Sequence, residues 1–396
     1  MEWINGGITA PEGFRAAGIG CGIKFDKPDL AVVVSDRDAL CAGCFTRNKV
    51  KAAPVRVCKD HLSKTNICRA FIVSSGIANA CTGEQGIENA RRMASLTAEQ
   101  LGVKTENVMV CSTGRIGTQL PLDKIAKGIV TVVGSASKDG AHDAAVAIMT
   151  TDVVPKEASC STIINGSKIT FGGMVKGAGM IAPDMATMLA FITTDAAVEP
   201  VFLQTVLREC VDKTFNSITV DGDTSTNDTV LMMANGVAGN PVITAGSEGA
   251  EMFRQALQGV CYSLAEQIVR DGEGATKLIQ VTVTGAVDNA SARKASHCVA
   301  NSLLLKVAFS GPDANWGRIM AALGRAGIEV DPDKIDVFIG DVPMVARGVE
   351  IAGNKNDARQ VWKQQTFVIT VDLHLGPGKD TCLTCDISHA YIDINL

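Results

Sequence analysis

Residues 160–171 read CSTIINGSKITF, and residues 175–194, which follow almost directly, read VKGAGMIAPDMATMLAFITT. In the first segment two short apolar runs flank Asn165-Gly166. Since Asn-Gly supplies the positive φ angles of a type I′ turn, we predict a β-hairpin here. In the second segment a turn with two glycines and a proline ends at Thr187 and leads into a β-branched apolar run, which is typical of a buried strand. The pattern therefore places Thr187 at the mouth of that strand.

Elsewhere short β-branched runs alternate with longer segments in which apolar residues recur every three or four positions. Such alternation favours an α/β or α+β fold. We predict strands at residues 30–35, 70–75, 108–112, 335–339 and 366–371. We predict helices at residues 87–101, 200–215, 248–270 and 316–326.

The composition excludes several classes of protein. The chain has 396 residues, of which 46% are hydrophobic and 20% charged, as expected for a soluble globular protein. Its net charge is -5 and no Lys/Arg run exceeds a pair, so we expect no nucleic-acid partner. The N-terminus lacks the pattern of a secretory signal. The sequence contains no stretch of about 18 apolar residues, the length needed to span a bilayer. We therefore expect a cytoplasmic protein without a membrane segment.

A threonine at the mouth of a buried strand can attack the carbonyl before it, here that of Ala186, if the turn is strained and donors hold the oxyanion. Cleavage leaves a new α-amino group on Thr187. An unperturbed α-amine has a pKa of about 7.7 to 8.0, so it can take the hydroxyl proton near neutral pH. Thr187 would then be nucleophile and base together. Threonines that simply enter a strand are common, and the residues alone also fit that structural role.

The string KGAGMIAPDMATMLA at residues 176–190 resembles the processing-site motif of the ornithine acetyltransferase (glutamate N-acetyltransferase) family. Further similar stretches occur in order along nearly the whole chain. They are GITAPEGFRAAGI at 7–19, FTRNKVKAAPV at 45–55, GIANACTG at 76–83, CSTGRIG at 111–117, TVDGDTSTNDT at 219–229 and GPDANWGRI at 311–319.

This resemblance implies a layered sandwich of sheets flanked by helices, a self-cleaved acyltransferase fold of the N-terminal-nucleophile kind. It implies cleavage between Ala186 and Thr187, with residues 1–186 forming an α chain and residues 187–396 a β chain. It also implies that both chains share one core, and that they assemble as an α2β2 heterotetramer. Thr187 is then the nucleophile that accepts the acyl group.

By motif matching, the resemblance assigns Thr113 and Gly114 to the oxyanion hole, the first through its hydroxyl and the second through its backbone N–H. Acyl transfer builds negative charge on a carbonyl oxygen, which such donors stabilise. The same residues also fit a turn that closes a strand. Lys176 matches a substrate-binding lysine, and its cation suits an α-carboxylate. A substrate-contacting threonine is expected at Thr150, with Thr151 as the alternative register.

Glu273 matches a substrate-binding glutamate that could pair with an amino group, and Asn395 matches a substrate-binding asparagine. The family places a Ser or Thr about five residues after this Asn, whereas this sequence stops at Leu396. A second departure is Ser74-Ser75-Gly76-Ile77 at residues 74–77, where the family pattern has Asn-Ser-Gly-Asn.

The resemblance implies a ping-pong reaction in which N-acetylornithine acetylates Thr187 and glutamate takes the acetyl group. Acetyl-CoA is a possible second donor, and we expect no resident cofactor or metal. One rival is an N-terminal-nucleophile aminopeptidase or amidase of the same fold, in which water resolves the acyl-enzyme. Another is a zinc-binding protein that uses the CxxC pairs at Cys41/Cys44 and Cys382/Cys385. We expect these cysteines to be reduced structural thiols.

Overall fold

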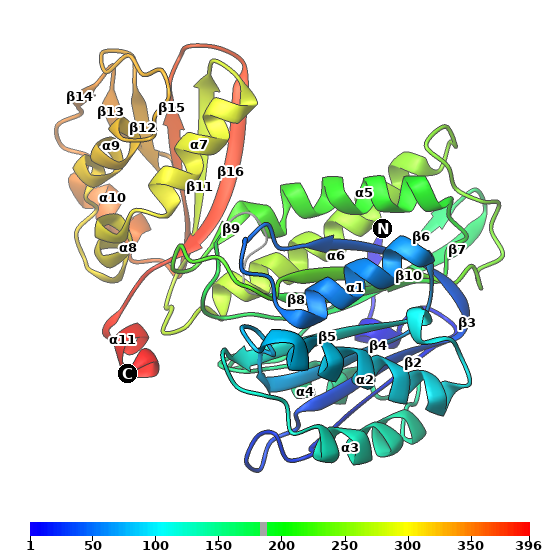
Figure 1. Ribbon diagram of the computed structural model, residues 1–396. Coiled ribbons are helices and arrows are strands. Elements are labelled where there is room, and N and C mark those ends of the chain that lie inside the picture. Colours follow the sequence, from blue (N-terminus) through cyan, green and yellow to red (C-terminus); the bar gives the residue numbers. More distant parts are fainter. Residues whose placement is uncertain (183–187) are drawn as a thin grey trace. The chain divides into compact units, whose positions relative to one another are not determined.

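The computed structural model describes residues 1–182 and 188–396, and these fall into two units. Of the described residues, unit 1 holds 1–177, 188–216 and 224–268, and unit 2 holds 178–182, 217–223 and 269–396. Each unit is built on its own β-sheet (Figure 1). Both mix strands with flanking helices, as the sequence predicted.

Unit 1 contains a nine-stranded sheet in the order β1-β6-β7-β8-β10-β3-β4-β5, with β2 paired to β3. Its strands are β1 Glu2–Trp3, β2 Phe14–Ile19, β3 Leu30–Phe45, β4 Ile67–Ile77, β5 Val108–Arg115, β6 Lys156–Ile164, β7 Ser167–Lys176, β8 Leu189–Thr194 and β10 Thr229–Ala234. Strands from both sides of the predicted cleavage point are neighbours, since β7 is antiparallel to β8 and β8 is parallel to β10. Both predicted segments therefore share one sheet.

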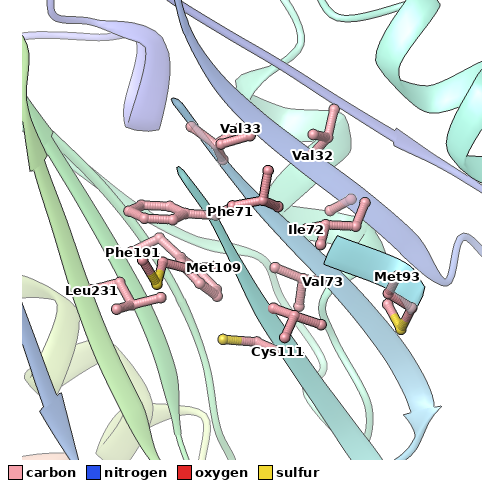
Figure 2. Close-up of a cluster of buried hydrophobic side chains, with 14 of the residues drawn as sticks. Val32, Val33, Phe71, Ile72, Val73, Met93, Met109, Cys111, Phe191 and Leu231 are labelled. Atoms are coloured by element: carbon pink, nitrogen blue, oxygen red, sulfur yellow. The ribbon is translucent and has the colours of Figure 1, made fainter. Parts of the chain in front are cut away.

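The long strand β3 lets this sheet fold over on itself. Its first part pairs with β2, its last part pairs with β10, and the register with β4 shifts between them, between Val34 and Ala39. The rings of Phe71 in β4 and Phe191 in β8 have centroids only 5.5 Å apart, although β3 and β10 lie between these strands (Figure 2). A flat sheet would separate them by about 14 Å, at roughly 4.8 Å per strand. The sheet thus forms the two layers of a sandwich.

Helices cover the outer faces of this sandwich. They are α1 Ala53–Lys64, α2 Gly83–Leu101, α3 Leu122–Gly134, α4 Ala141–Ala147, α5 Pro200–Lys213 and α6 Ala250–Arg270, with short 3-10 turns at Gly7–Thr9, Thr105–Asn107 and Phe215–Ser217. Apolar residues of α1 to α4 join one core with β2 to β5. On the other layer, Phe253 of α6 packs against Phe171 of β7 and Phe202 of α5. This core buries the strands whose ends carry the predicted site.

Unit 2 contains a seven-stranded sheet in the order β14-β13-β12-β15-β11-β16-β9. Its strands are β9 Ile218–Thr219, β11 Leu278–Ala286, β12 Asp336–Ile339, β13 Val342–Ala346, β14 Val349–Glu350, β15 Thr366–Asp372 and β16 Gly378–Cys385. Its helices are α7 Asn289–Ala300, α8 Leu303–Ser310, α9 Trp316–Gly324, α10 Lys355–Trp362 and α11 His389–Asn395. The rings of Phe309, Trp362 and Phe367 pack together in its core.

The structure confirms the predicted hairpin, strands and helices. β6 and β7 are joined by Asn165 with φ 49° and Gly166 with φ 81°, the two positive angles that a type I′ turn requires. All six residues of β8 are buried. No helix in residues 1–182 and 188–396 is long and apolar enough to cross a bilayer. The division of the chain at Ala186 and Thr187 stays a prediction, because both residues lie outside the described ranges.

Candidate active site

The predicted oxyanion residues lie at the end of β5. Thr113 is buried, and Gly114 next to it is exposed. They pair in parallel with Ser75 and Gly76 of β4. Gly114 has φ 126°, and a Cβ at this position would overlap the backbone of Gly76. Only glycine fits this conformation and this close approach, so the strand end is built for a backbone that other residues cannot adopt.

Asn227, just before β10, holds this strand end from the side. Its amide nitrogen donates to the carbonyl of Ser112 at 2.8 Å and to the carbonyl of Ala78 at 2.6 Å. Its amide oxygen accepts the hydroxyl of Thr226 at 2.6 Å. Asn227 is buried, and its side chain joins the segments that follow β4 and precede Thr113.

The next residue, Asp228, holds the start of β8. Thr187 lies outside the described residues. Met188, which follows it, makes hydrogen bonds through both its backbone N–H and its backbone carbonyl. Asp228 Oδ1 accepts the Met188 N–H at 3.2 Å, and the Thr229 N–H donates to the Met188 carbonyl at 3.2 Å. Asp228 is fully buried, and its Oδ2 has no hydrogen-bond partner among residues 1–182 and 188–396. Burial raises the pKa of this carboxyl well above its usual value.

The buried carboxylate of Asp152 joins Thr150 to Gly177, the residue that follows Lys176. Asp152 Oδ1 accepts the Gly177 N–H at 2.6 Å and the Lys156 ammonium at 2.6 Å, while Oδ2 accepts the Thr150 N–H at 2.9 Å. Although burial raises the pKa of Asp152, the charges of Lys176 and Lys156 outweigh it and hold that pKa well below its usual range. Lys176 itself is 3% exposed at the end of β7.

Lys24 adds a further cation to this part of unit 1. Its ammonium donates to the carbonyl of Met149, which precedes Thr150, at 2.9 Å. A Cβ added at Gly76 would lie 3.0 Å from the Lys24 side chain. Burial lowers the pKa of Lys24 to about 8, against a smaller attraction from Asp29. Lys24 could not be predicted from the sequence, because a lysine in a glycine-rich loop carries no local sign of burial.

In unit 2 the structure brings Glu273 and Asn395 together. The Asn395 amide nitrogen donates to Glu273 Oε2 at 2.8 Å, and the Glu273 N–H donates to the carbonyl of Ala178 at 2.9 Å. Glu273 is 8% exposed. A Cβ at Gly179 would overlap its carboxylate. A glycine of the processing motif therefore leaves room for the predicted substrate-binding acid.

A second acid of unit 2, the half-buried Asp221, binds the same motif. Asp221 accepts the N–H groups of Met180 at 2.5 Å and Ile181 at 2.8 Å. The hydroxyl of Tyr391 donates to it at 3.3 Å. Burial raises the pKa of Asp221, and burial together with Asp221 raises that of Tyr391 to about 12.

The CxxC pairs do not have the geometry of a metal site. Cys41 and Cys44 lie in β3, and Cys382 and Cys385 lie in β16. Since residues i and i+3 of a strand point to opposite faces, neither pair converges on one ion. All thirteen cysteines are free, and among the described residues there is no group of three or more His, Cys, Asp or Glu suited to a metal ion.

The predicted site residues thus fall into two sets, and their roles stay predictions. Unit 1 holds Thr113, Gly114, Thr150 and Lys176, of which Thr150 is half-buried while the alternative Thr151 is exposed. Unit 2 brings together Glu273 and Asn395. Asp152 follows the predicted threonines Thr150 and Thr151, and Asp228 lies in the stretch TVDGDTSTNDT, but no role was predicted for either acid. The sequence did offer one sign of these acids, because each carboxylate lies beside Thr or Asn within or next to a matching motif.

Comparison with known proteins identifies the family. The family model described as "ArgJ family" matches residues 15–396. The arginine biosynthesis bifunctional protein ArgJ of Symbiobacterium thermophilum is 48% identical over 398 residues, covering 100% of this chain and 99% of that protein. That of Geobacter sulfurreducens is 50% identical over 389 residues, covering 97% and 98%. The crystal structure of ArgJ from Bacillus halodurans is 42% identical with a TM-score of 0.50, covering 51% of this chain and 95% of that chain.

These matches confirm the resemblance that the motifs indicated, along the whole chain and at high identity. They do not favour the aminopeptidase alternative. The chain belongs to the ArgJ family of arginine-biosynthesis enzymes.

Proposed function

We propose that this chain transfers the acetyl group of N-acetylornithine to glutamate through an acetyl ester on Thr187, after cleavage between Ala186 and Thr187. One observation carries the proposal. In a chain whose family match covers residues 15–396, Lys176 pairs with Leu189 in the strand that begins just after Thr187. The adjacent residues Asn227 and Asp228 bind the carbonyl before Thr113 and the N–H of Met188.

In the first half-reaction Thr187 Oγ attacks the acetyl carbonyl carbon, and the α-amino group of Thr187 takes the hydroxyl proton. The carbon–nitrogen bond then breaks as that proton passes to the leaving nitrogen, which gives ornithine and the acetyl ester. In the second half-reaction the amine of glutamate attacks the ester carbonyl. The carbon–oxygen bond breaks, Oγ regains a proton, and N-acetylglutamate leaves. Thr113 and Gly114 stabilise the oxyanion in both halves.

Charge complementarity supports the substrate-binding roles. Lys176 offers a buried cation for an α-carboxylate, and Thr150 is held close to it through Asp152. The α-nitrogen of N-acetylornithine is acylated, so its only free amine is the side-chain ammonium. Glu273, held by Asn395, is the carboxylate proposed to pair with that ammonium.

The relatives are named bifunctional proteins, which supports a second activity, glutamate acetylation from acetyl-CoA. We extend this to the present chain as a proposal. It predicts that acetyl-CoA acetylates Thr187 in the absence of N-acetylornithine. We further propose a cytoplasmic α2β2 assembly without resident cofactor. Native mass spectrometry tests the assembly, whose mass should be twice the summed mass of the two cleaved chains.

The deciding experiment follows cleavage and acylation in one preparation. Intact mass and N-terminal sequencing should show two chains, the second beginning Thr187-Met188-Leu189. A brief incubation with N-acetylornithine should add one acetyl group to this second chain, and glutamate should remove it far faster than water does. Equal deacylation with and without glutamate would assign a hydrolase. Thr187→Ala should remain a single unacetylated chain.

A further inference from the structure

Two adjacent buried residues, Asn227 and Asp228, contact the two backbone segments whose separation matters most for acyl transfer. Asn227 binds the carbonyl of Ser112, directly before Thr113. Asp228 binds the N–H of Met188, directly after Thr187. We propose that this pair consists of positioning residues, which set the distance between the oxyanion strand end and the nucleophile. The inference rests on the roles proposed above for Thr113 and Thr187.

The chemistry of each side chain fits this task. Asn227 donates two hydrogen bonds from one nitrogen to two carbonyls from different segments, at 2.6 Å and 2.8 Å. An isosteric Asp cannot donate either bond and would place oxygen against oxygen. The oxygen of Asn227 is also satisfied by Thr226. Both polar atoms of this amide already bind other groups of the protein, so we assign it a geometric contribution.

Asp228 supplies an acceptor where the strand ladder starts. With Thr229 it holds both the N–H and the carbonyl of Met188. Because consecutive Cα atoms are about 3.8 Å apart, the two neighbours act as a short rigid spacer between β5 and β8. A displacement of about 1 Å between reacting groups can cost about 10²-fold in rate, so a spacer at this point affects turnover strongly.

The same strands provide matched controls at their opposite ends. Asn235 follows β10, is as buried as Asn227, and donates to the carbonyl of Glu12 at 2.8 Å. Asp195 follows β8, is buried, and accepts the N–H of Thr170 at 2.8 Å. Loss of either side chain removes a comparable buried hydrogen bond without touching the segments next to Thr113 or Thr187. A purely structural role predicts the same behaviour at both ends.

The experiment compares Asn227→Asp, Asp228→Ala and Asp228→Asn with Asn235→Asp and Asp195→Ala, all assayed below their melting temperatures. We expect Asn227→Asp and Asp228→Ala to lower kcat and the rate of self-cleavage about 10²-fold, with KM changed less than about threefold. Asp228→Asn keeps an acceptor for Met188 and should retain most activity. The controls should lower Tm but keep kcat.

If Asn227→Asp fails to fold, Asn227→Gln, whose amide is one methylene too long, replaces it. Near-normal kcat in the folded Asn227 and Asp228 variants would overturn the proposal, and so would an Asp228→Asn enzyme as slow as Asp228→Ala. Thr187→Ala separates this from the proposed function. If that variant still transfers acetyl groups, both ideas fail. If it is inactive while the Asn227 variants keep normal kcat, only the positioning role fails.

Discussion

Asp152→Asn is the substitution whose effect the structure predicts most fully. The side chains of Asp152 and Lys156 are both fully buried and their charged atoms are 2.6 Å apart. The carboxylate also accepts backbone N–H groups from Thr150 and Gly177. Asparagine has nearly the same shape, but it removes the negative charge that Asp152 places 2.6 Å from the buried ammonium of Lys156. Breaking a buried ion pair by removing one partner costs about 3–5 kcal/mol, and we expect the free energy of unfolding to fall by that amount.

The pH dependence gives a sharper test of the cause. The pKa of Asp152 is lower in the folded state than the value of about 3.9 in an unfolded chain. Its ionised form therefore stabilises the fold above about pH 4, and this contribution is lost as pH falls toward the folded-state pKa. The variant lacks the group, so the difference between variant and wild type should be largest near neutral pH and shrink below pH 4.

Urea unfolding in a Thr187→Ala background, where the chain stays in one piece, measures both quantities. Asp195→Asn is the matched control, since Asp195 is buried without a cation among the causes of its raised pKa. Ionisation of Asp195 opposes folding as pH rises through its folded-state pKa, so the loss in Asp195→Asn should decrease, not grow, with rising pH. A cost below about 1 kcal/mol for Asp152→Asn, or a cost independent of pH between 2 and 6, would refute the ion-pair argument.

Three shorter predictions concern activity. Thr113→Ala should lower kcat by about 10²- to 10³-fold with little change in KM once cleavage is complete, whereas a raised KM at normal kcat would place its hydroxyl on the bound substrate. Burial lowers the pKa of Lys24 to about 8, so its charge is lost as pH rises through 8; KM for N-acetylornithine should increase there in wild type but not in Lys24→Met. Gly179→Ala would crowd the Glu273 carboxylate and should raise that KM, while Gly246→Ala, with open space around it, should not.

Local chemistry explains which parts of the fold the sequence predicted well. The turn at Asn165-Gly166 depends only on two residues that tolerate positive φ, and β8 depends on a continuous apolar run. The prediction for β3 stopped at residue 35, but the strand continues to Phe45. Three exposed charged residues at 36–38 interrupt its apolar run, at the point where the register shifts. A bulge that turns the strand from one layer to the other thus resembles a strand end in sequence.

The site residues that sequence reasoning missed act through backbone groups far away in the chain. Asn227 binds a carbonyl 149 positions away, and Asp152 binds an N–H 25 positions away. No pattern of spacing predicts such partners, because the fold alone brings them together. Glycines in the matching motifs were easier to recognise as site residues than these acids and amides. Gly114 and Gly179 both lie in such motifs, and neither position has room for a Cβ.

Three buried aspartates of unit 1 show why the charge of the site follows from the fold and not from residue type. Asp152 has two cations close by, and its pKa is lowered despite burial. Burial raises the pKa values of Asp195 and Asp228, and backbone N–H donors offset this effect only in part. Of the two aspartates near the predicted site, Asp152 therefore stays ionised to lower pH and can balance Lys176, whereas Asp228 resists ionisation beside Met188. This division keeps a negative charge beside the lysine proposed to bind carboxylate, and favours a neutral group next to the residue that follows the proposed nucleophile.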